Sequence, residues 1–466
     1  MDMKTLTQKW MLLGVLCALV GAVACGDDDG PEPMEDGGTP GMDSSTPDED
    51  SGTPGEDAGE PTTMVTVDAD ITSDTMWTAD NTYLLAAPIY VSDATLTIEA
   101  GTTIMGTSGA NALIVTTTGR VEAEGTADAP IVFTSANDPG ARGPGDWGGV
   151  VLLGEAPINV PGGTNNIEGL DPGEARGQYG GDDATHDCGT LRYVRIEWAG
   201  FVFGDDNELN GLTLGGCGSD TVLEHIQVHG GLDDGIEFFG GTANLKWAVV
   251  TQVGDDSLDW DQGYQGKIQF FVAQQSVGNR GIEADNLGDN NDVTPRSNPT
   301  VYNMTLVGGG AAEQQGMRLR RGTAGIIANA IVTGFSMEEC VRVDGTSTIT
   351  QANDGDLVIQ NSLLEGCVED GGMVGYFDFT PDEGDMVMIT ADWTTDNKLG
   401  EDPMLGDATN LDAPNFIPAA ASPAASDAAT PPDDGFFDAT ATYMGAFEPD
   451  GDDWMAGWTA FPILPE

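Results

Sequence analysis

Polar side chains occupy the third position of a five-residue phrase that occurs six times in the middle of the chain. Successive copies start 24, 22, 24, 35 and 24 residues apart, from Gly211 to Cys340. The third residues are, in order, Thr213, Glu237, Asp259, Glu283, Arg318 and Arg342. Carboxylate oxygens are the ligands that hard divalent cations prefer. Glu237, Asp259 and Glu283 therefore form a candidate metal site, with Ca²⁺ as the candidate ion.

The residues around these positions alternate between apolar and polar, which is typical of a strand with one buried face. In the copy at Gly235, Ile236 and Phe238 would point inward and Glu237 outward. A second strand-like phrase keeps the same period and starts at Leu223, Leu245 and Ile268. Strands that return every 22 to 24 residues, with no helical pattern between them, predict an all-β solenoid, the parallel β-helix. We expect it over residues 64–466.

Stacking these strands brings like charges together. Neighbouring strands lie about 4.8 Å apart, and two carboxylates at that distance repel by roughly 3 kcal/mol at an effective dielectric constant near 20. Three carboxylates in a row therefore require a cation, a raised pKa or an ion pair, and Arg318 on the next coil offers that ion pair. The alternative is that the column only forms a solvated polar face of the coil.

Further charged residues lie in the corners before and after these strands. The corners Leu232-Asp-Asp-Gly-Ile and Gly254-Asp-Asp-Ser-Leu contain Asp234, Asp255 and Asp256. On adjacent coils, such pairs could supply the acid and the base that glycoside hydrolysis needs. Short Asp-Asp phrases also suit β-helix corners for their turn geometry alone. The remaining candidates for ligand binding are Asp261, Asp285, Arg280 and Arg320.

The coil-forming stretches resemble a known group of proteins. Leu96-Thr-Ile-Glu-Ala-Gly, Gly119-Arg-Val-Glu-Ala-Glu-Gly and Trp147-Gly-Gly-Val look like successive coils of right-handed parallel β-helix proteins of the pectin-lyase-like superfamily. Asp402-Pro-Met and Asn415-Phe-Ile-Pro look like its closing coils. The resemblance covers roughly residues 90–460 and is similar to forms carried by bacterial surface lipoproteins. It implies a fold, and fold alone does not imply function.

The corners are also similar, in part, to the polygalacturonase motif set. That resemblance implies an acidic trio of Asp234, Asp255 and Asp256, with Arg318 and Arg320 holding a uronate carboxylate. Arg280 stands where that family has histidine, so the set is incomplete. A lyase is the other enzymatic option, with Ca²⁺ among the three column carboxylates and Arg318 as the base.

The N-terminus reads as an export signal. Lys4 and Lys9 precede an apolar run that ends in Ala22-Val23-Ala24-Cys25, which resembles a lipoprotein box. We expect a signal peptide over 1–24, lipidation of Cys25 and anchoring to the outer membrane or cell surface. The alternative is ordinary secretion. Residues 25–63, rich in Pro, Gly, Asp and Glu, cannot bury a core and are expected to form a disordered acidic tether.

Charge and cysteine content narrow the function further. The formal net charge of −61 disfavours nucleic-acid binding, which needs a basic surface, and fits either solubility in a salty medium or cation binding. Four cysteines follow the tether, at gaps of about one coil, which predicts the disulfides Cys188–Cys217 and Cys340–Cys367. A metal site at His186 and Cys188 is the alternative.

Three segments do not follow the period. Residues 155–187 and 287–299 read as loops inserted over the working face, and the aromatic tail from Phe436 onward is expected to cap the open end of the coil. Three functions fit these features. The first is a lipid-anchored protein that binds a glycan or envelope component with divalent cations. The others are a polysaccharide hydrolase or lyase, and a structural spacer or adhesin.

Overall fold

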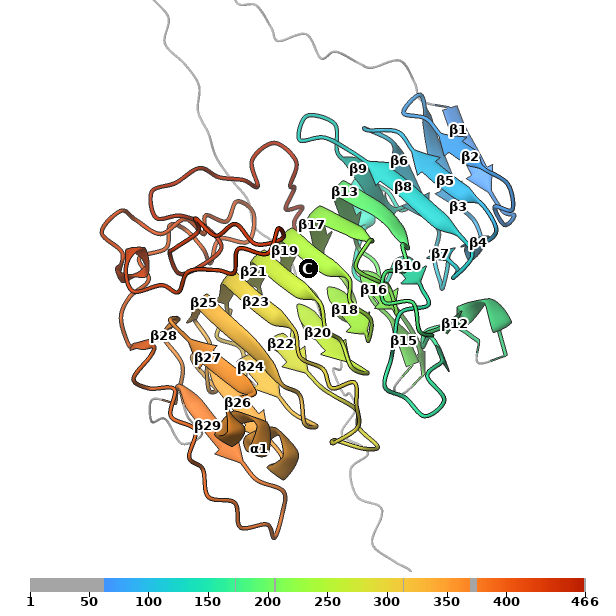
Figure 1. Cartoon of the computed structure of the whole chain (residues 1–466). Coiled ribbons are helices and arrows are strands. Elements are labelled where there is room, and N and C mark those ends of the chain that lie inside the picture. Colours follow the sequence, from blue (N-terminus) through green and yellow to red (C-terminus); the bar gives the residue numbers. More distant parts are fainter. Residues whose placement is uncertain (1–62, 172, 205–206, 313, 369–374, 465–466) are drawn as a thin grey trace, which may run out of the picture. The chain divides into compact units, whose positions relative to one another are not determined.

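A computed structural model of the chain describes residues 63–464 except 172, 205–206, 313 and 369–374. These residues form coils of parallel strands stacked along one axis (Figure 1). The predicted all-β parallel β-helix is thus confirmed. The expected signal peptide, the lipidation site Cys25 and nearly all of the tether lie outside the described residues. Within the described residues, no helix has the length and apolar character needed to cross a membrane.

The smaller sheet carries the charged phrases. Its strands are β4 (Ile89–Val91), β7 (Ala112–Val115), β10 (Gly149–Leu153), β16 (Leu212–Gly215), β18 (Ile236–Phe239), β20 (Leu258–Asp261), β22 (Arg280–Ala284), β24 (Gln315–Leu319), β26 (Val341–Asp344) and β29 (Phe377–Thr380). All neighbouring pairs are parallel. Glu237 pairs in register with Thr213 on one side and Asp259 on the other, and Glu283 pairs with Asp259 and Arg318. The predicted column is therefore real.

The larger sheet covers the other sides of the coil. Its main path is β1 (Thr63–Val67), β3 (Asn81–Leu85), β6 (Thr103–Gly106), β9 (Ile131–Ser135), β13 (Gly189–Glu197), β17 (Val222–His229), β19 (Asn244–Thr251), β21 (Lys267–Gln274), β23 (Thr300–Val307), β25 (Gly325–Thr333), β28 (Leu363–Glu365) and β30 (Lys398–Leu399). Beside this path lie β2 (Thr75–Trp77), β5 (Thr95–Ile98), β8 (Arg120–Glu124) and β27 (Leu357–Gln360).

A bend divides each long strand of this sheet. One residue at the bend adopts a positive φ between 50° and 59°, and these residues are Tyr193, His225, Trp247, Phe270, Asn303 and Asn329. On the next coil Asn361, with a φ of 49°, lies between the short strands β27 and β28. The first four rings stack on one another, with centroids 4.1, 4.7 and 5.8 Å apart. The bend lets one strand line two sides of the coil.

The interior of the coil is apolar. Ile236, Phe238, Leu258 and Trp260, which the alternation placed inward, are all buried in one continuous core. Each removes an apolar side chain from water, which supplies the main driving force for stacking coils. At the last coil, Trp393 joins this core and packs against the aromatic rings of β29.

Insertions interrupt the coils on the side of the smaller sheet. The predicted loop 155–187 contains only the short pair β11 (Asn165–Asn166) and β12 (Gln178–Tyr179), and 287–299 contains no described strand. A third insertion, the hairpin β14 (Phe201–Gly204) and β15 (Asn207–Leu209), was not predicted. The helix α1 (Thr346–Asp354) lies beside β26 and β27 (Figure 1).

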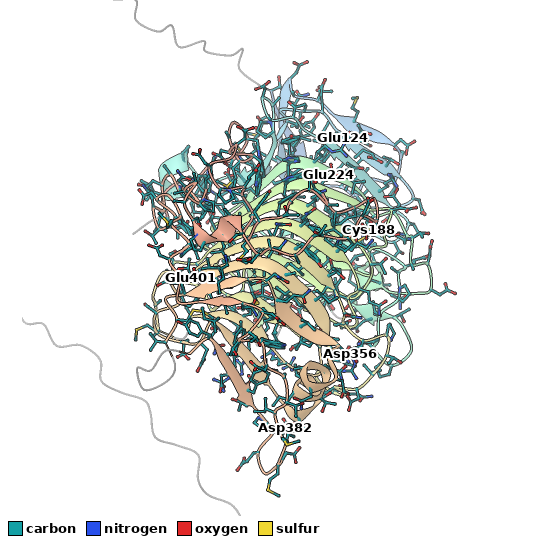
Figure 2. The ribbon with its side chains drawn as sticks, turned by 60° about the vertical axis from the view of Figure 1, so that its left-hand side comes forward. Glu124, Cys188, Glu224, Asp356, Asp382 and Glu401 are labelled. Atoms are coloured by element: carbon teal, nitrogen blue, oxygen red, sulfur yellow. A yellow bond between two sulfur atoms is a disulfide. The ribbon has the colours of Figure 1, made fainter. Side chains whose placement is uncertain are left out.

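Both predicted disulfides are present. Cys188 pairs with Cys217, and Cys340 with Cys367 (Cys188 is labelled in Figure 2). Each bridge joins neighbouring coils. Because the Cys188 sulfur is bonded to Cys217, the alternative metal site at His186 and Cys188 is wrong.

The C-terminal tail does not cap the open end, and residues 402–425 add no further coils. Residues 401–464, here called the strap, run back along the outer face of the larger sheet (red in Figure 1). Phe416, Phe447 and Trp458 pack on Val249 and Val272 of that face. Glutamine and asparagine side chains of the larger sheet bind the strap's backbone. In the sequence these residues alternate with core residues and look like ordinary outward positions, so the place where the tail packs could not be predicted from them.

Replacing one anchor is expected to weaken the fold. Gln227 donates to Ala460 O at 2.7 Å and accepts from Ala460 N at 2.9 Å. Gln227→Ala leaves both strap groups without these partners, which should cost about 1–3 kcal/mol of unfolding free energy. Urea unfolding followed by fluorescence measures it. The control is Gln178→Ala, since Gln178 is solvent-exposed and its side chain forms no hydrogen bond among the described residues. An equal loss in both variants would contradict a specific role for the anchor.

Candidate functional site

Three columns of side chains, polar except at Phe239, run across the outer face of the smaller sheet. Because the coils are in register, each coil contributes one residue from the corner before the strand, one from its middle and one from its end. From β18 to β26 these triplets are Asp234, Glu237, Phe239; Asp256, Asp259, Asp261; Arg280, Glu283, Asp285; Gln315, Arg318, Arg320; and Glu339, Arg342, Asp344. The face is therefore acidic at β18 and β20 and becomes basic at β24.

The acidic coils form the floor of a cleft of about 430 Å³, here called the acidic cleft. Its lining includes all eight predicted acids: Asp234, Asp255, Asp256, Glu237, Asp259, Asp261, Glu283 and Asp285. Arg320 also lines it, whereas Arg280 lies at its edge and pairs with two of its acids. The sequence did not predict Glu168, Glu208, Asp233 and Arg321, which together with Phe239 complete the lining.

The missed residues come from places that no repeat marks. Glu168 belongs to the loop 155–187 and Glu208 to the hairpin β14–β15. The only feature of the sequence that indicated a role for Glu168 and Glu208 was the expectation that inserted loops cover the face that binds the ligand. Asp233 could have been found, because it stands beside Asp234 in the same corner. Together these residues wall the cleft, so that Glu237 and Glu283, although outside the coil, are only 7% and 6% exposed.

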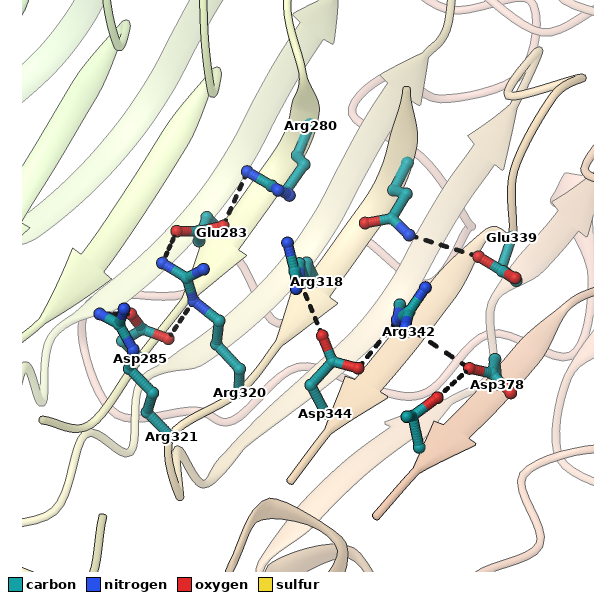
Figure 3. A network of polar contacts seen from close by, with 12 residues as sticks. Arg280, Glu283, Asp285, Arg318, Arg320, Arg321, Glu339, Arg342, Asp344 and Asp378 are labelled. Atoms are coloured by element: carbon teal, nitrogen blue, oxygen red, sulfur yellow. Dashed lines mark hydrogen bonds and ion pairs between the residues drawn. The ribbon is translucent and has the colours of Figure 1, made fainter. Parts of the chain in front are cut away.

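Arginines neutralise one half of the acidic cleft. Arg280 lies 2.8 Å from Glu283, and Arg320 pairs with Glu283 and lies 2.8 Å from Asp285 (Figure 3). Arg280 also lies 3.3 Å from Asp256. The predicted ion pair between Arg318 and the acidic column is wrong. Arg318 lies 2.7 Å from Asp344 on the far side (Figure 3). Arg320 replaces it because its position at the strand end faces Asp285.

In the other half of the cleft, no basic side chain among the described residues forms an ion pair with Asp234, Glu237 or Asp259. Burial, followed by the charges of Asp256 and Asp233, raises the pKa of Asp234 well above its usual range. Burial and the charges of Glu168 and Asp259 do the same for Glu237. These acids resist ionisation because burial and the neighbouring carboxylates disfavour their charged form.

Elevated pKa values extend along the cleft. Burial and the charges of Asp234 and Asp285 raise the pKa of Asp259 well above its usual range, and burial with Asp255 raises that of Asp256 to about 7. Burial also raises the pKa of Asp285 to about 7 despite Arg321. Burial lowers the pKa of Arg320 to about 10, so its guanidinium stays charged at neutral pH.

Several shielded carboxylate oxygens lack hydrogen bonds. Among the described residues, no donor binds Oδ1 of Asp256, Asp259 or Asp261. Asp256 is only 2% exposed, so bulk water has little access to this oxygen. An unpaired buried oxygen costs free energy, and a proton or a cation would remove that cost.

Three sets of carboxylates are close enough to hold a cation. In each set the ligand atoms lie within 4.8 Å of one another: Asp233, Asp234, Asp255; Asp234, Glu237, Asp259; and Asp256, Asp259, Glu283. The predicted triplet Glu237, Asp259 and Glu283 is therefore divided between two sets. Asp259 belongs to both, and the set with Glu283 already faces Arg280. The oxygen ligands suit Ca²⁺ in kind.

Comparison with known proteins places the fold in a family. Residues 69–383, more than half of the chain, match the family model of the pectate-lyase-like β-helix domain. No curated protein and no solved structure matches the chain. The match covers the coils that build the acidic cleft. The chain therefore belongs to the pectate-lyase-like β-helix family, and its coils form a right-handed parallel β-helix.

Proposed function

We propose that the protein binds an acidic glycan or a similar envelope component in the acidic cleft, with divalent cations, Ca²⁺ first among them, between the ligand and the carboxylates. A β-helix domain of this family is compatible with glycan binding or degradation. The observation that carries the proposal is the set of shielded carboxylate oxygens without donors on Asp256, Asp259 and Asp261.

The cation is expected at Asp234, Glu237 and Asp259. These three offer ligand atoms within 4.8 Å of one another, whereas Glu283, the third predicted ligand, is paired with Arg280 and Arg320. A cation here would replace the protons that the raised pKa values imply. It would also present a positive charge to a ligand that an uncompensated acidic cleft would repel.

The N-terminal sequence supports export with a lipid anchor at Cys25, outside the described residues. The two disulfides fit an oxidising compartment. We place the protein at the outer membrane or cell surface, where residues 25–63 would tether the β-helix. Its partners there would be a polysaccharide or another envelope component, and the net charge of −61 opposes nucleic acid.

Polysaccharide cleavage is the second candidate function. Asp256, with a pKa raised to about 7 by burial and by Asp255, could act as an acid at neutral pH. Asp234 and Asp255 line the same cleft. Arg318 is paired with Asp344 and is not part of the cleft lining, which weakens the full polygalacturonase-like or lyase-like set.

One experiment separates binding from cleavage. Isothermal titration with an oligogalacturonate should give binding in Ca²⁺ and none in EDTA, while a neutral oligoglucose of equal length should not bind. New reducing ends, lost on Asp256→Asn, would establish cleavage. Equal binding of both oligosaccharides, or binding that survives EDTA, would contradict the cation-bridged proposal.

A further inference from the structure

We propose that the C-terminal end of the β-helix binds an extended segment of a partner protein, with alternating apolar and basic side chains, as one more strand on the open edge of β29. The inference goes beyond the proposed function, because this surface shares no lining residue with the acidic cleft. β29 is the last strand of the smaller sheet and pairs, among the described residues, only with β26 (Figure 1).

The two ends of the smaller sheet differ in how their edges are covered. At the first strand, β4, the backbone of Ile71 occupies the edge: its N–H donates to Tyr90 O at 2.8 Å and its carbonyl accepts from Ser92 N at 3.0 Å. At β29 no described backbone group takes this place. An uncovered edge presents N–H and C=O groups in a row, which is a template for pairing with another chain.

The backbone of β29 directs two residues toward this edge. The N–H and C=O of one residue point to the same side of a strand, and successive residues alternate in side. Tyr376 O accepts from Val341 N at 3.0 Å, so Tyr376 and every second residue after it face β26. Phe377 and Phe379 therefore direct their backbone groups to the open edge, and their side chains are only half-buried.

A groove of about 400 Å³, here called the end groove, runs along the same edge. One wall is formed by five consecutive residues, 375–379, and only the edge of a strand can present consecutive residues to one groove, since their side chains alternate between two faces. The other wall is Ile389 with residues 391–394, which form no backbone hydrogen bond with β29 among the described residues. The ring of Trp393 lies 5.5 and 5.2 Å from those of Phe377 and Phe379, so the groove has an apolar base.

The charges of the end groove define the partner. Its charged lining residues are Glu339, Asp378 and Asp392, and no lysine or arginine lines it. A second copy of this chain, with a formal net charge of −61, would meet repulsion here, whereas a basic segment would be attracted.

The two faces of β29 set the order of the partner's side chains. Phe377 and Phe379 pack on the core of the coil, and Asp378 lies on the outer face beside Arg342, at 4.0 Å (Figure 3). A strand added at the edge continues both faces, because side chains alternate along it. Its inward residues would therefore be apolar and its outward residues basic. Ile389, 42% exposed on the opposite wall, offers further apolar contact.

The test uses a capped heptapeptide of alternating lysine and valine, with binding measured by fluorescence anisotropy on the full chain. Ile389→Lys should weaken its binding about tenfold, because a cation in the groove repels the lysines. Ile326→Lys is the matched control: Ile326 is 38% exposed on β25, outside the groove, and its replacement changes the net charge equally. Equal binding to wild type and Ile389→Lys, or an equal loss in both variants, overturns the proposal.

A second comparison uses only the wild-type protein, so it does not depend on the folding of a variant. A peptide with the same four lysines and three valines in two blocks should bind about tenfold more weakly, since it cannot match the two faces. N-methylation of the valines and N-methylation of the lysines should have unequal effects, because each set points to one edge of the added strand. Equal binding of the block peptide would show attraction by net charge alone and overturn the strand. A wild-type dimer in sedimentation equilibrium that Ile389→Lys dissociates would assign the groove to a second copy and overturn the basic partner.

Discussion

Calcium is expected to raise the unfolding temperature of the wild-type protein by several degrees, and Asp259→Asn to remove most of that rise. An ion that binds only the folded state adds about 2.7 kcal/mol when its concentration is a hundred times Kd. Asp259 belongs to two of the carboxylate sets that could hold a cation, one with Asp234 and Glu237 and one with Asp256 and Glu283. Removing one of its oxygen ligands and its charge therefore weakens either arrangement of the cation.

The same substitution should have the opposite effect in EDTA. Without a cation, burial and then the charges of Asp234, Asp285 and Asp256 disfavour the ionised form of Asp259 and raise its pKa. Asp259→Asn removes this repulsion, so at pH 8 in EDTA the variant should unfold at a higher temperature than the wild type. Differential scanning calorimetry with and without Ca²⁺ measures both effects.

A control on the same sheet face isolates the cation. Asp344 lies on β26 and pairs with Arg318 and Arg342, away from the cleft lining. Asp344→Asn should lower stability in both conditions and leave the increment from Ca²⁺ unchanged. If Asp259→Asn instead lowers the unfolding temperature equally with Ca²⁺ and with EDTA, the cleft holds no cation at Asp259.

Stability in EDTA is expected to fall as the pH rises from about 4 to about 8. Burial raises the folded-state pKa of Asp233, Asp256 and Asp285 from 3.8 to about 7. Between these two values the folded protein holds protons that the unfolded chain releases, so the free energy of unfolding decreases with increasing pH. The stabilisation is complete below the unfolded-state pKa and is lost as the pH passes about 7.

The expected loss of stability between about pH 4 and about pH 8 amounts to several kcal/mol. A shift of three pKa units corresponds to about 4 kcal/mol for a single group. The groups interact, so their protons leave in shared steps and the total is less than the sum. In excess Ca²⁺ the decline should be much smaller, because the cation replaces the protons and its binding releases them.

Calorimetry at pH 5 and pH 8, each with EDTA and with Ca²⁺, tests the pH dependence. The wild type should lose several degrees in EDTA between the two pH values. Asp256→Asn, which cannot ionise at that position, should show a smaller loss. An unfolding temperature that stays constant in EDTA would mean that these carboxyls titrate normally and that the cleft is more hydrated than the structure indicates.

The sequence predicts the repeat-based part of this site well. The strands of the smaller sheet and their register follow from alternation and spacing, so the column through Glu237, Asp259 and Glu283 could be predicted residue by residue. The ion pairs could not. Arg318 lies opposite Glu283 on the neighbouring strand, and Arg320 lies two residues further along that strand. Which of the two arginines pairs with Glu283 depends on side-chain direction, which the repeat pattern does not specify.

Non-repeating segments carry the rest of the site, and their positions were not predictable. Glu168 and Glu208 reach the cleft through insertions whose paths no period describes. The aromatic residues of the strap, such as Trp458, indicate only that the tail is buried somewhere. Their partners on the larger sheet, Val249 and Val272, alternate with core residues and look like any outward position.

The strap changes how the coils depend on one another. A solenoid held only by neighbouring coils frays from its ends, one coil at a time. Here Gln227 binds Ala460, 233 residues later in the chain, and Gln269 and Asn303 bind Asp438 and Tyr443. The coils from β17 to β23 are therefore all bound to the strap and should unfold in a single cooperative step. In synthesis from the N-terminus, these coils gain their full protection only when residues 438–460 have been made.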